Sequence, residues 1–186
     1  EIAVIDSALA TVMQGLFVLE ACRLRNEQVP IGPAVQELER IKKTGRIFFT
    51  IKNLDYLRHG GRIGKLASMA GSLLGIRPVI ALRDGELFSA GMTKARNRSK
   101  EKSQKLFLEH MESTYKNPEK YRAVVGYGYD QEEGAAFHER VCQGLLRIGH
   151  KAVVPMYKIG NVIGAHIGPY PIGAAVIDRA VIPAAQ

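Results

Sequence analysis

The chain has 186 residues, 46% of them hydrophobic, and a formal net charge of +8, and this length can bury the core of one large domain or of one domain plus part of another. No apolar run is long enough to span a bilayer, and neither a signal-peptide pattern nor an internal repeat is visible, so we expect a cytoplasmic protein that is not a solenoid. Cys22 and Cys142 lack C-x-x-C spacing and are expected to be reduced, mostly buried thiols.

The first quarter of the chain predicts two helices between two strands. A strand is expected at Ala3–Ile5, helices at Thr11–Asn26 and Pro33–Lys43, and a second strand at Arg46–Ile51. The first helix has apolar residues at helical spacing, and its core face is expected to consist of Val12, Leu16, Leu19 and Leu24.

The block from Tyr56 to Gly91 is the most informative part of the sequence. Gly60 and Gly61 allow positive φ or a close backbone approach. Lys65–Leu74 has helical spacing. Ile76–Leu82 and Glu86–Met92 then read as two strands, and the Asp-Gly between them predicts a hairpin because these residues tolerate the positive φ of a primed turn.

Strands and helices alternate through the remaining third of the chain. Helices are expected at about Asn97–Tyr115 and Glu132–Ile148, and strands at Tyr121–Tyr129, Ala152–Tyr157, Asn161–Ile167 and Pro171–Ile177. This alternation predicts βαβ-type connectivity, whereas the Asp-Gly hairpin adds an antiparallel pair. The predicted fold class is therefore α/β, with a mixed β-sheet flanked by helices.

Three segments resemble motifs of the bacterial DegV family, in the order in which that family carries them. Ile2–Gly15 resembles V-I-D-S-x-x-x-S-M-G-x-G. The block from Tyr56 to Gly91 resembles K-G-G-R-I-S followed by L-L-G-I-K-P and D-G. Ile163–Gly173 resembles the closing I-G-x-H-x-G-P-G-x-[LI]-G. Three motifs over nearly the whole chain make a specific match, which a single G-G-R would not.

The resemblance also implies a domain organisation. Residues 1–45 correspond to the C-terminal remnant of a first, parallel α/β domain, and residues 46–186 to a C-terminal α/β lipid-binding domain. On this reading the chain is N-terminally truncated, and the family's Thr and Ser-Gly-Thr head-group loops belong to the missing part.

His166 is the candidate for binding a ligand carboxylate. By itself, a His in an apolar turn is more often a hydrogen-bonded structural residue. The resemblance favours the binding role, because the family carries a His here close to a bound carboxylate, and an imidazole N–H can donate to a carboxylate oxygen. The turn departs from the family pattern at Ala165, Ile167 and Tyr170, so hydroxyl donors are lost unless the Tyr170 hydroxyl replaces them.

An acyl pocket is a second expectation from the resemblance. The block from Tyr56 to Gly91 supplies apolar side chains that could line a slot for a fatty acyl chain, although the same residues could form an ordinary core. The candidates are Leu66, Met69, Leu73, Leu74 and Ile76, with Val79 and Ile80 beyond them.

Basic residues gather at the start of the predicted helix Asn97–Tyr115, where the helix dipole makes cations unfavourable. This cluster is either a solubilising face or a surface that binds phosphate or an acidic partner. In the resembled family, basic residues at this position are implicated in docking a kinase. The docking candidates are Arg62, Lys94, Arg96 and Arg98, and the cluster continues through Lys100, Lys102 and Lys105.

The resemblance implies a non-catalytic protein that binds a long-chain fatty acid and presents its carboxylate to a separate ATP-dependent kinase. Contact with membrane lipid at the periphery is compatible with this role. No cofactor and no metal are expected, because the histidines lack ligand spacing and no Walker A loop, G-x-G-x-x-G or G-x-S-x-G occurs. Nucleic acid is not an expected partner, since no nucleic-acid-binding motif accompanies the basic cluster. The alternatives are a basic regulatory or nucleic-acid-binding domain, and an enzyme whose active site lies in the missing segment.

Overall fold

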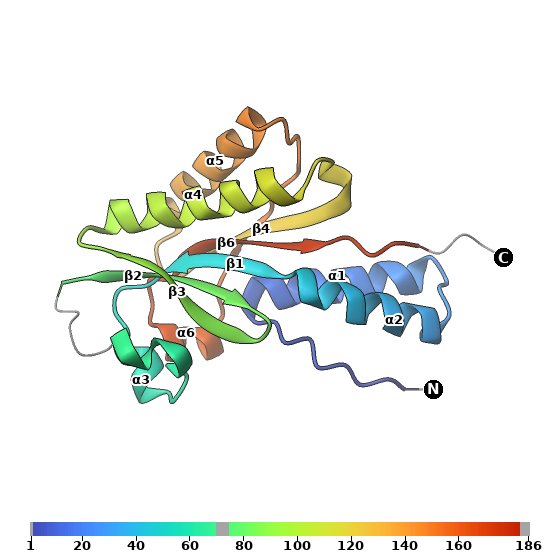
Figure 1. Ribbon diagram of the computed structural model, residues 1–186, viewed down its shortest axis with the longest axis horizontal. Coiled ribbons are helices and arrows are strands. Elements are labelled where there is room, and N and C mark those ends of the chain that lie inside the picture. Colours follow the sequence, from blue (N-terminus) through green and yellow to red (C-terminus); the bar gives the residue numbers. More distant parts are fainter. Residues whose placement is uncertain (1, 70–74, 183–186) are drawn as a thin grey trace.

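The computed structural model describes residues 2–69 and 75–182 (Figure 1). These residues contain six α-helices. In chain order they are α1 Thr11–Asn26, α2 Ile31–Ile41, α3 Asp55–His59, α4 Arg96–Thr114, α5 Gln131–Arg147 and α6 Asn161–Ile167. The strands are β1 Arg46–Thr50, β2 Arg77–Arg83, β3 Glu86–Thr93, β4 Tyr121–Tyr127, β5 Met156–Lys158 and β6 Ile172–Asp178. Short 3₁₀ turns are η1 Lys42–Thr44, η2 Gly64–Met69 and η3 Pro118–Lys120.

The strands form one mixed sheet in the order β3-β2-β1-β6-β4-β5. Strands β4 and β5 are parallel and are joined through α5, which is the predicted βαβ unit, and the other neighbouring strands are antiparallel. Asp84 (φ 51°) and Gly85 (φ 76°) both adopt positive φ in the turn between β2 and β3, as a primed hairpin turn requires. The predicted α/β class with a mixed sheet is confirmed.

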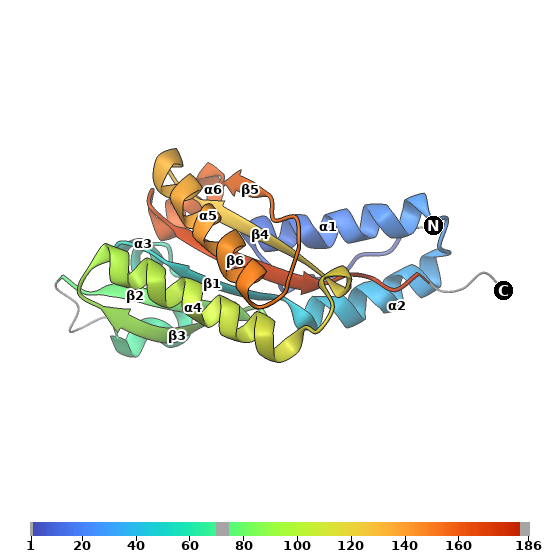
Figure 2. The same cartoon turned by 90° about the horizontal axis from the view of Figure 1, so that it is seen from above.

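Helices cover both faces of the sheet. Helices α4 and α5 lie on one face, and α1, α2, α3 and α6 lie on the other (Figures 1 and 2). Central strands therefore contribute side chains to two cores: Ala175 and Ile177 of β6 belong to the α1–α2 side, whereas Ala174 and Val176 belong to the α4–α5 side. Burial on both faces explains why β6 is a continuous apolar run rather than an alternating one.

Helices α1 and α2 form a hairpin that packs directly on the sheet, and their buried residues share one hydrophobic cluster with β1 (Figure 1). Glu20 fixes this packing because its fully buried carboxylate accepts hydrogen bonds from the guanidinium groups of Arg23 and Arg122 and from the backbone N–H of Ala180. The described part of residues 1–45 contains two helices and no strand. The domain boundary near residue 45 stays a prediction.

Two predicted strands are wrong. Ala3–Ile5 forms no strand; the segment is irregular, and Ile2 and Val4 are 92% and 95% exposed. Asn161–Ile167 is the helix α6, which begins after Gly160 and ends at Gly168, a residue with φ 83°. Ile163, His166 and Ile167 have the i, i+3, i+4 spacing that places side chains on one face of a helix.

Other predicted segments differ in length. The strand predicted at Ala152–Tyr157 contracts to β5, since Pro155 precedes it and Val153 is 93% exposed. The helix predicted at Lys65–Leu74 is described only as far as Met69, because residues 70–74 lie outside the described residues. The described part forms the 3₁₀ turn η2. In α1, Leu19 is 46% exposed, and Met13, Phe17 and Glu20 complete the core face instead. The bounds of the remaining predicted elements agree with the structure to within two residues.

Candidate functional site

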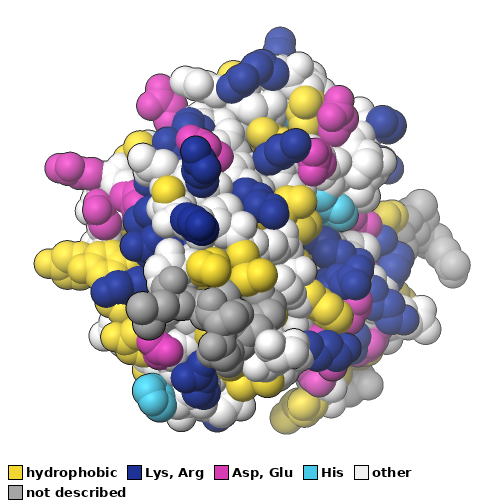
Figure 3. Space-filling view, turned by 60° about the vertical axis from the view of Figure 1, so that its left-hand side comes forward, with side chains coloured by type: hydrophobic (Ala, Val, Ile, Leu, Met, Phe, Trp, Pro, Cys, Tyr) yellow, Lys and Arg dark blue, Asp and Glu magenta, His cyan; other side chains and the backbone are white. Residues whose placement is uncertain are grey.

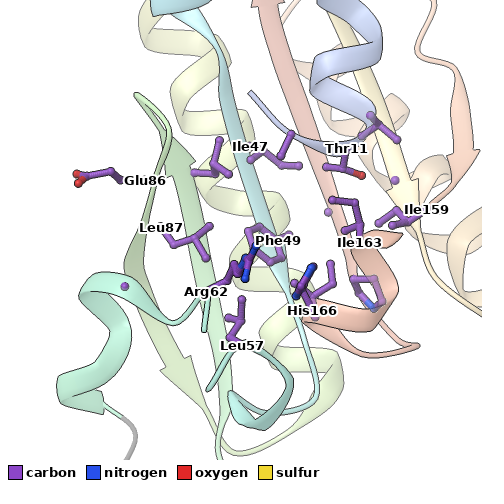
Figure 4. A pocket seen from close by; sticks show the side chains of 18 of the residues that line it. Thr11, Ile47, Phe49, Leu57, Arg62, Glu86, Leu87, Ile159, Ile163 and His166 are labelled. Carbon is purple, nitrogen blue, oxygen red and sulfur yellow. The ribbon is translucent and has the colours of Figure 1, made fainter. Parts of the chain in front are cut away.

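A cavity of about 500 Å³, which we call the apolar pocket, lies on the face of the sheet that carries α3 and α6. Its wall is built by apolar side chains from several elements, as Figure 4 shows. Strands β1, β2 and β3, helices α3 and α6, and the segment before α6 contribute Ile47, Phe49, Leu57, Leu82, Leu87, Ile159, Ile163 and Ile167. An apolar cavity of this size with few polar groups is the usual form of a small-molecule site.

Besides the rim residues Lys65 and Glu86, three polar side chains join this wall at separate points of the chain: Thr11, Arg62 and His166. Arg62 and His166 both point into the pocket beside Phe49 (Figure 4). Thr11 is the first residue of α1 and lies within the first family-like motif, Ile2–Gly15. The three motifs noted in the sequence therefore meet at one cavity.

The Gly60-Gly61 pair positions Arg62. Helix α3 ends at Gly60, and Gly61, with φ 66°, reverses the chain so that the backbone N–H of Arg62 donates to the carbonyl oxygen of Leu57 at 2.8 Å. The Arg62 guanidinium donates to the carbonyl oxygen of Gly60, also at 2.8 Å. This fixes the stem of the side chain, and the other guanidinium N–H groups are left for a ligand oxygen.

His166 lies in the last turn of α6 and is half-buried. Its Nδ1 atom is shielded from solvent without a hydrogen-bond partner among the described residues. The imidazole packs against Gly60 so closely that a Cβ on that glycine would lie 2.5 Å from Nδ1. A side chain at residue 60 would therefore push the imidazole out of its place in the pocket.

The rim of the pocket carries an ion pair. Lys65 and Glu86 both line the pocket and pair with each other, and the two side chains are more than half exposed. The Lys65 ammonium also lies 4.7 Å from the centre of the Phe88 ring, where the Arg83 guanidinium lies as well. Lys65 of η2 is thus held against the hairpin of β2 and β3 by Glu86 and Phe88.

The residues predicted to line an acyl pocket do not line the apolar pocket where their side chains are described. Leu66 is fully buried in the core and Ile76 is half-buried, and neither lines the apolar pocket. Nothing is described for the Met69 side chain, and Leu73 and Leu74 lie outside the described residues. Val79 and Ile80 are buried core residues of β2. The observed wall combines Leu57, Leu82 and Leu87 of this block with residues of β1, of α6 and of the segment before α6, which are distant in sequence.

The basic cluster divides into two groups. Arg96 and Lys100 face α5 and form ion pairs with Glu133, whose carboxylate is 14% exposed. Burial raises the pKa of Glu133, but hydrogen bonds from Arg96 and Lys100 outweigh it and lower the pKa overall. Lys94 and Arg98 instead are exposed. Lys and Arg side chains are spread over the face shown in Figure 3, which includes the β2–β3 end of the sheet.

The turn residues that depart from the family pattern are placed as follows. Ile167 lines the apolar pocket, whereas Ala165 is exposed. Tyr170 is not among the lining residues; its ring contacts Tyr129, and the Arg96 guanidinium lies 5.8 Å from its centre. The Tyr170 hydroxyl therefore does not replace the lost donors within the described pocket.

Residues 2–69 and 75–182 contain no group of three or more His, Cys, Asp or Glu side chains arranged to hold a metal ion. None of the helices in this part of the chain is both long and apolar enough to cross a membrane.

Fold and pocket together define a mixed α/β protein with an apolar cavity on one face of its sheet. The chain belongs to the DegV family: the family model described as "Uncharacterised protein, DegV family" matches residues 1–179. A DegV domain-containing protein of Clostridium acetobutylicum is 31% identical over 176 residues, which cover 94% of this chain and 59% of that protein.

Solved structures of the same family are similar in fold. A stearic acid-binding protein from Eubacterium ventriosum is 36% identical with a TM-score of 0.86, over 96% of this chain and 60% of that one. A fatty acid-binding DegV family protein from Thermus thermophilus is 27% identical with a TM-score of 0.83, over 95% of this chain and 60% of that one. The chain thus spans about 60% of the length of these relatives.

Proposed function

We propose that this protein binds a long-chain fatty acid, with the acyl chain in the apolar pocket and the carboxylate at Arg62 and His166. The observation that carries the proposal is the convergence of these two side chains on a cavity of about 500 Å³ whose wall is otherwise mainly aliphatic. Membership of a family in which relatives are described as fatty acid-binding proteins supports the same ligand class.

The chemistry of the pocket fits such a ligand. Each methylene moved from water into an apolar wall contributes about 0.8 kcal/mol, so a long chain supplies most of the affinity. The carboxylate adds a charge-assisted hydrogen bond from the Arg62 guanidinium and a donor from the His166 imidazole. Within the described pocket, no Ser, Thr or Cys is hydrogen-bonded to a histidine or carboxylate, which is consistent with binding rather than covalent catalysis.

Native mass spectrometry of the protein purified from bacteria tests this proposal. We expect an adduct of fatty acid mass, and we expect His166→Ala to reduce its occupancy while the circular dichroism spectrum stays unchanged. His59→Ala is the matched control, since His59 is exposed at the end of α3 and does not line the pocket. Absence of an adduct, together with no binding of added stearate, would overturn the proposal.

We further propose that the bound carboxylate is presented to a separate ATP-dependent kinase that docks on exposed cations at the start of α4. Lys94 and Arg98 support this role because both are exposed, and Arg62 lies at the pocket itself. Arg96 and Lys100 are already paired with Glu133, which removes two charges from the surface that the sequence suggested. This pairing also weakens the alternative of a nucleic-acid-binding surface, which depends on unpaired cations.

A further inference from the structure

A second hollow, which we call the side groove, adjoins the apolar pocket. It measures about 510 Å³ and lies between the first half of α1 and the segment from β5 to α6. Four of its lining residues also line the apolar pocket, so the two cavities share one wall: Thr11, Val12, Ile159 and Ile163. The remaining lining residues are Gly15, Leu16, Leu19, Tyr157, Lys158 and Gly160.

Glycines keep this region open. A Cβ added to Gly15 or to Gly160 would meet no atom within 4 Å, so both positions leave empty space at the groove. At the shared wall, Gly126 of β4 lines the apolar pocket, and a Cβ there would lie 3.1 Å from a methyl of Val12 and 3.4 Å from Ile159. A side chain at residue 126 would therefore crowd Val12 and Ile159, the two residues that lie between the cavities.

We propose that the side groove is the distal part of the acyl site, and that it takes the methylene groups of a long fatty acid beyond those held in the apolar pocket. This inference rests on the proposed function. A chain whose carboxylate is held at Arg62 and His166 would run past Val12 and Ile159, which line both cavities, and continue along α1.

The lining of the groove suits hydrocarbon. Leu16 is buried beneath it, whereas Leu19 and Tyr157 are 46% and 52% exposed, so a hydrocarbon chain on them removes apolar surface from water. The one charged lining residue is Lys158, and its ammonium lies 6.0 Å from the centre of the Tyr129 ring. No acidic side chain lines the groove in the described part of the chain.

Gly15→Leu is the direct test, because the new side chain would fill the groove from α1. Leucine is a better helix former than glycine and meets no atom at its Cβ, so the melting temperature should not fall. Gly32→Leu in α2 is the matched control, since Gly32 also has open space around its Cβ and lines neither cavity. Gly126→Ala narrows the passage from the opposite wall and provides an independent second variant.

The measurement is the affinity for a series of saturated fatty acids of increasing length, by displacement of a fluorescent fatty acid. For the native protein and Gly32→Leu we expect the affinity to rise by roughly fourfold per methylene up to long chains. For Gly15→Leu and Gly126→Ala the series should flatten at a length where the native series still rises.

Three results would count against the inference in different ways. Superimposable series for Gly15→Leu and the native protein would overturn the side groove as part of the acyl site, yet leave fatty acid binding intact. A uniform loss at every chain length in Lys158→Ala would also overturn it, since it would place the carboxylate in the groove. If the native protein bound no fatty acid, the proposed function itself would fail.

Discussion

Gly60 and His166 are in direct contact although they are distant in the sequence, and a Cβ on Gly60 would lie 2.5 Å from Nδ1 of the imidazole. Gly60 has φ −77°, an ordinary value for any residue, so its backbone conformation does not require glycine. The requirement for glycine comes from the close approach of the His166 ring. This contact joins the second and third family motifs.

We therefore predict that Gly60→Ala displaces the His166 imidazole and weakens fatty acid binding on the order of tenfold, the equivalent of one hydrogen bond to a charged group. The loss should resemble that of His166→Ala, and the two changes together should cost little more than either alone. Gly164→Ala in α6 is the control, because a Cβ there meets no atom within 4 Å. Full additivity of the two losses would show that Gly60 does not act through His166.

We predict that Arg96 stabilises the fold whereas Arg98 does not. Arg96→Glu would replace the cation beside the Glu133 carboxylate by a second negative charge, and the side chains of both residues are mostly buried. The free energy of unfolding should fall by about 1–3 kcal/mol, measured by urea denaturation. Arg98→Glu, at an exposed position of the same helix, should change it by less than about 0.5 kcal/mol. Equal stability of the two variants would contradict this assignment.

The kinase-docking proposal predicts a different outcome for the exposed cations. Lys94→Glu combined with Arg98→Glu should leave the melting temperature and fatty acid affinity nearly unchanged while sharply reducing phosphorylation of the bound fatty acid by the partner kinase. Higher salt should reproduce part of this loss with the native protein, because exposed charges are screened. A normal phosphorylation rate for the double variant would return Lys94 and Arg98 to a solubilising role.

The stability of the fold should decrease in acid. Burial raises the pKa values of Glu20 and Glu37, but hydrogen bonds from Arg23 and Arg122 to Glu20, and from Arg40 to Glu37, outweigh it and lower both. A carboxyl group with a lowered folded-state pKa contributes stability that is fully present above its unfolded value of 4.5 and is lost as the pH falls through the folded value. The free energy of unfolding, measured in urea, should therefore decline progressively below about pH 4.5.

Glu20 allows a variant test of this pH dependence. Its carboxylate is fully buried and accepts four hydrogen bonds, so Glu20→Gln should destabilise the protein at pH 7 by about 3–5 kcal/mol, because Arg23 and Arg122 lose their buried counter-charge. The native protein and the variant should then converge in stability as the pH falls. A constant difference between them down to pH 2 would contradict a lowered pKa for Glu20.

Local patterns in the sequence predicted those elements that local physics decides. The hairpin of β2 and β3 follows from Asp84-Gly85, which adopts the positive φ that this dipeptide favours. The helix predicted at Glu132–Ile148 is α5, and the Asp130 side chain caps it by accepting a hydrogen bond from the backbone N–H of Glu133. The family-like motifs also contain Arg62 and His166, which the resemblance indicated as candidate site residues.

Tertiary structure decided what those patterns left open. Asn161–Ile167 is rich in residues that suit a strand, yet it is a helix because Ile163, His166 and Ile167 then share the face that lines the apolar pocket. The sequence predicts Arg96 as a docking residue for a partner. The packing of α4 beside α5 instead brings it to Glu133, with which it forms an ion pair. The block from Tyr56 to Gly91 supplies only part of the apolar wall, because a cavity on a sheet also collects its lining from elements such as β1 and α6 that are neighbours in space and distant along the chain.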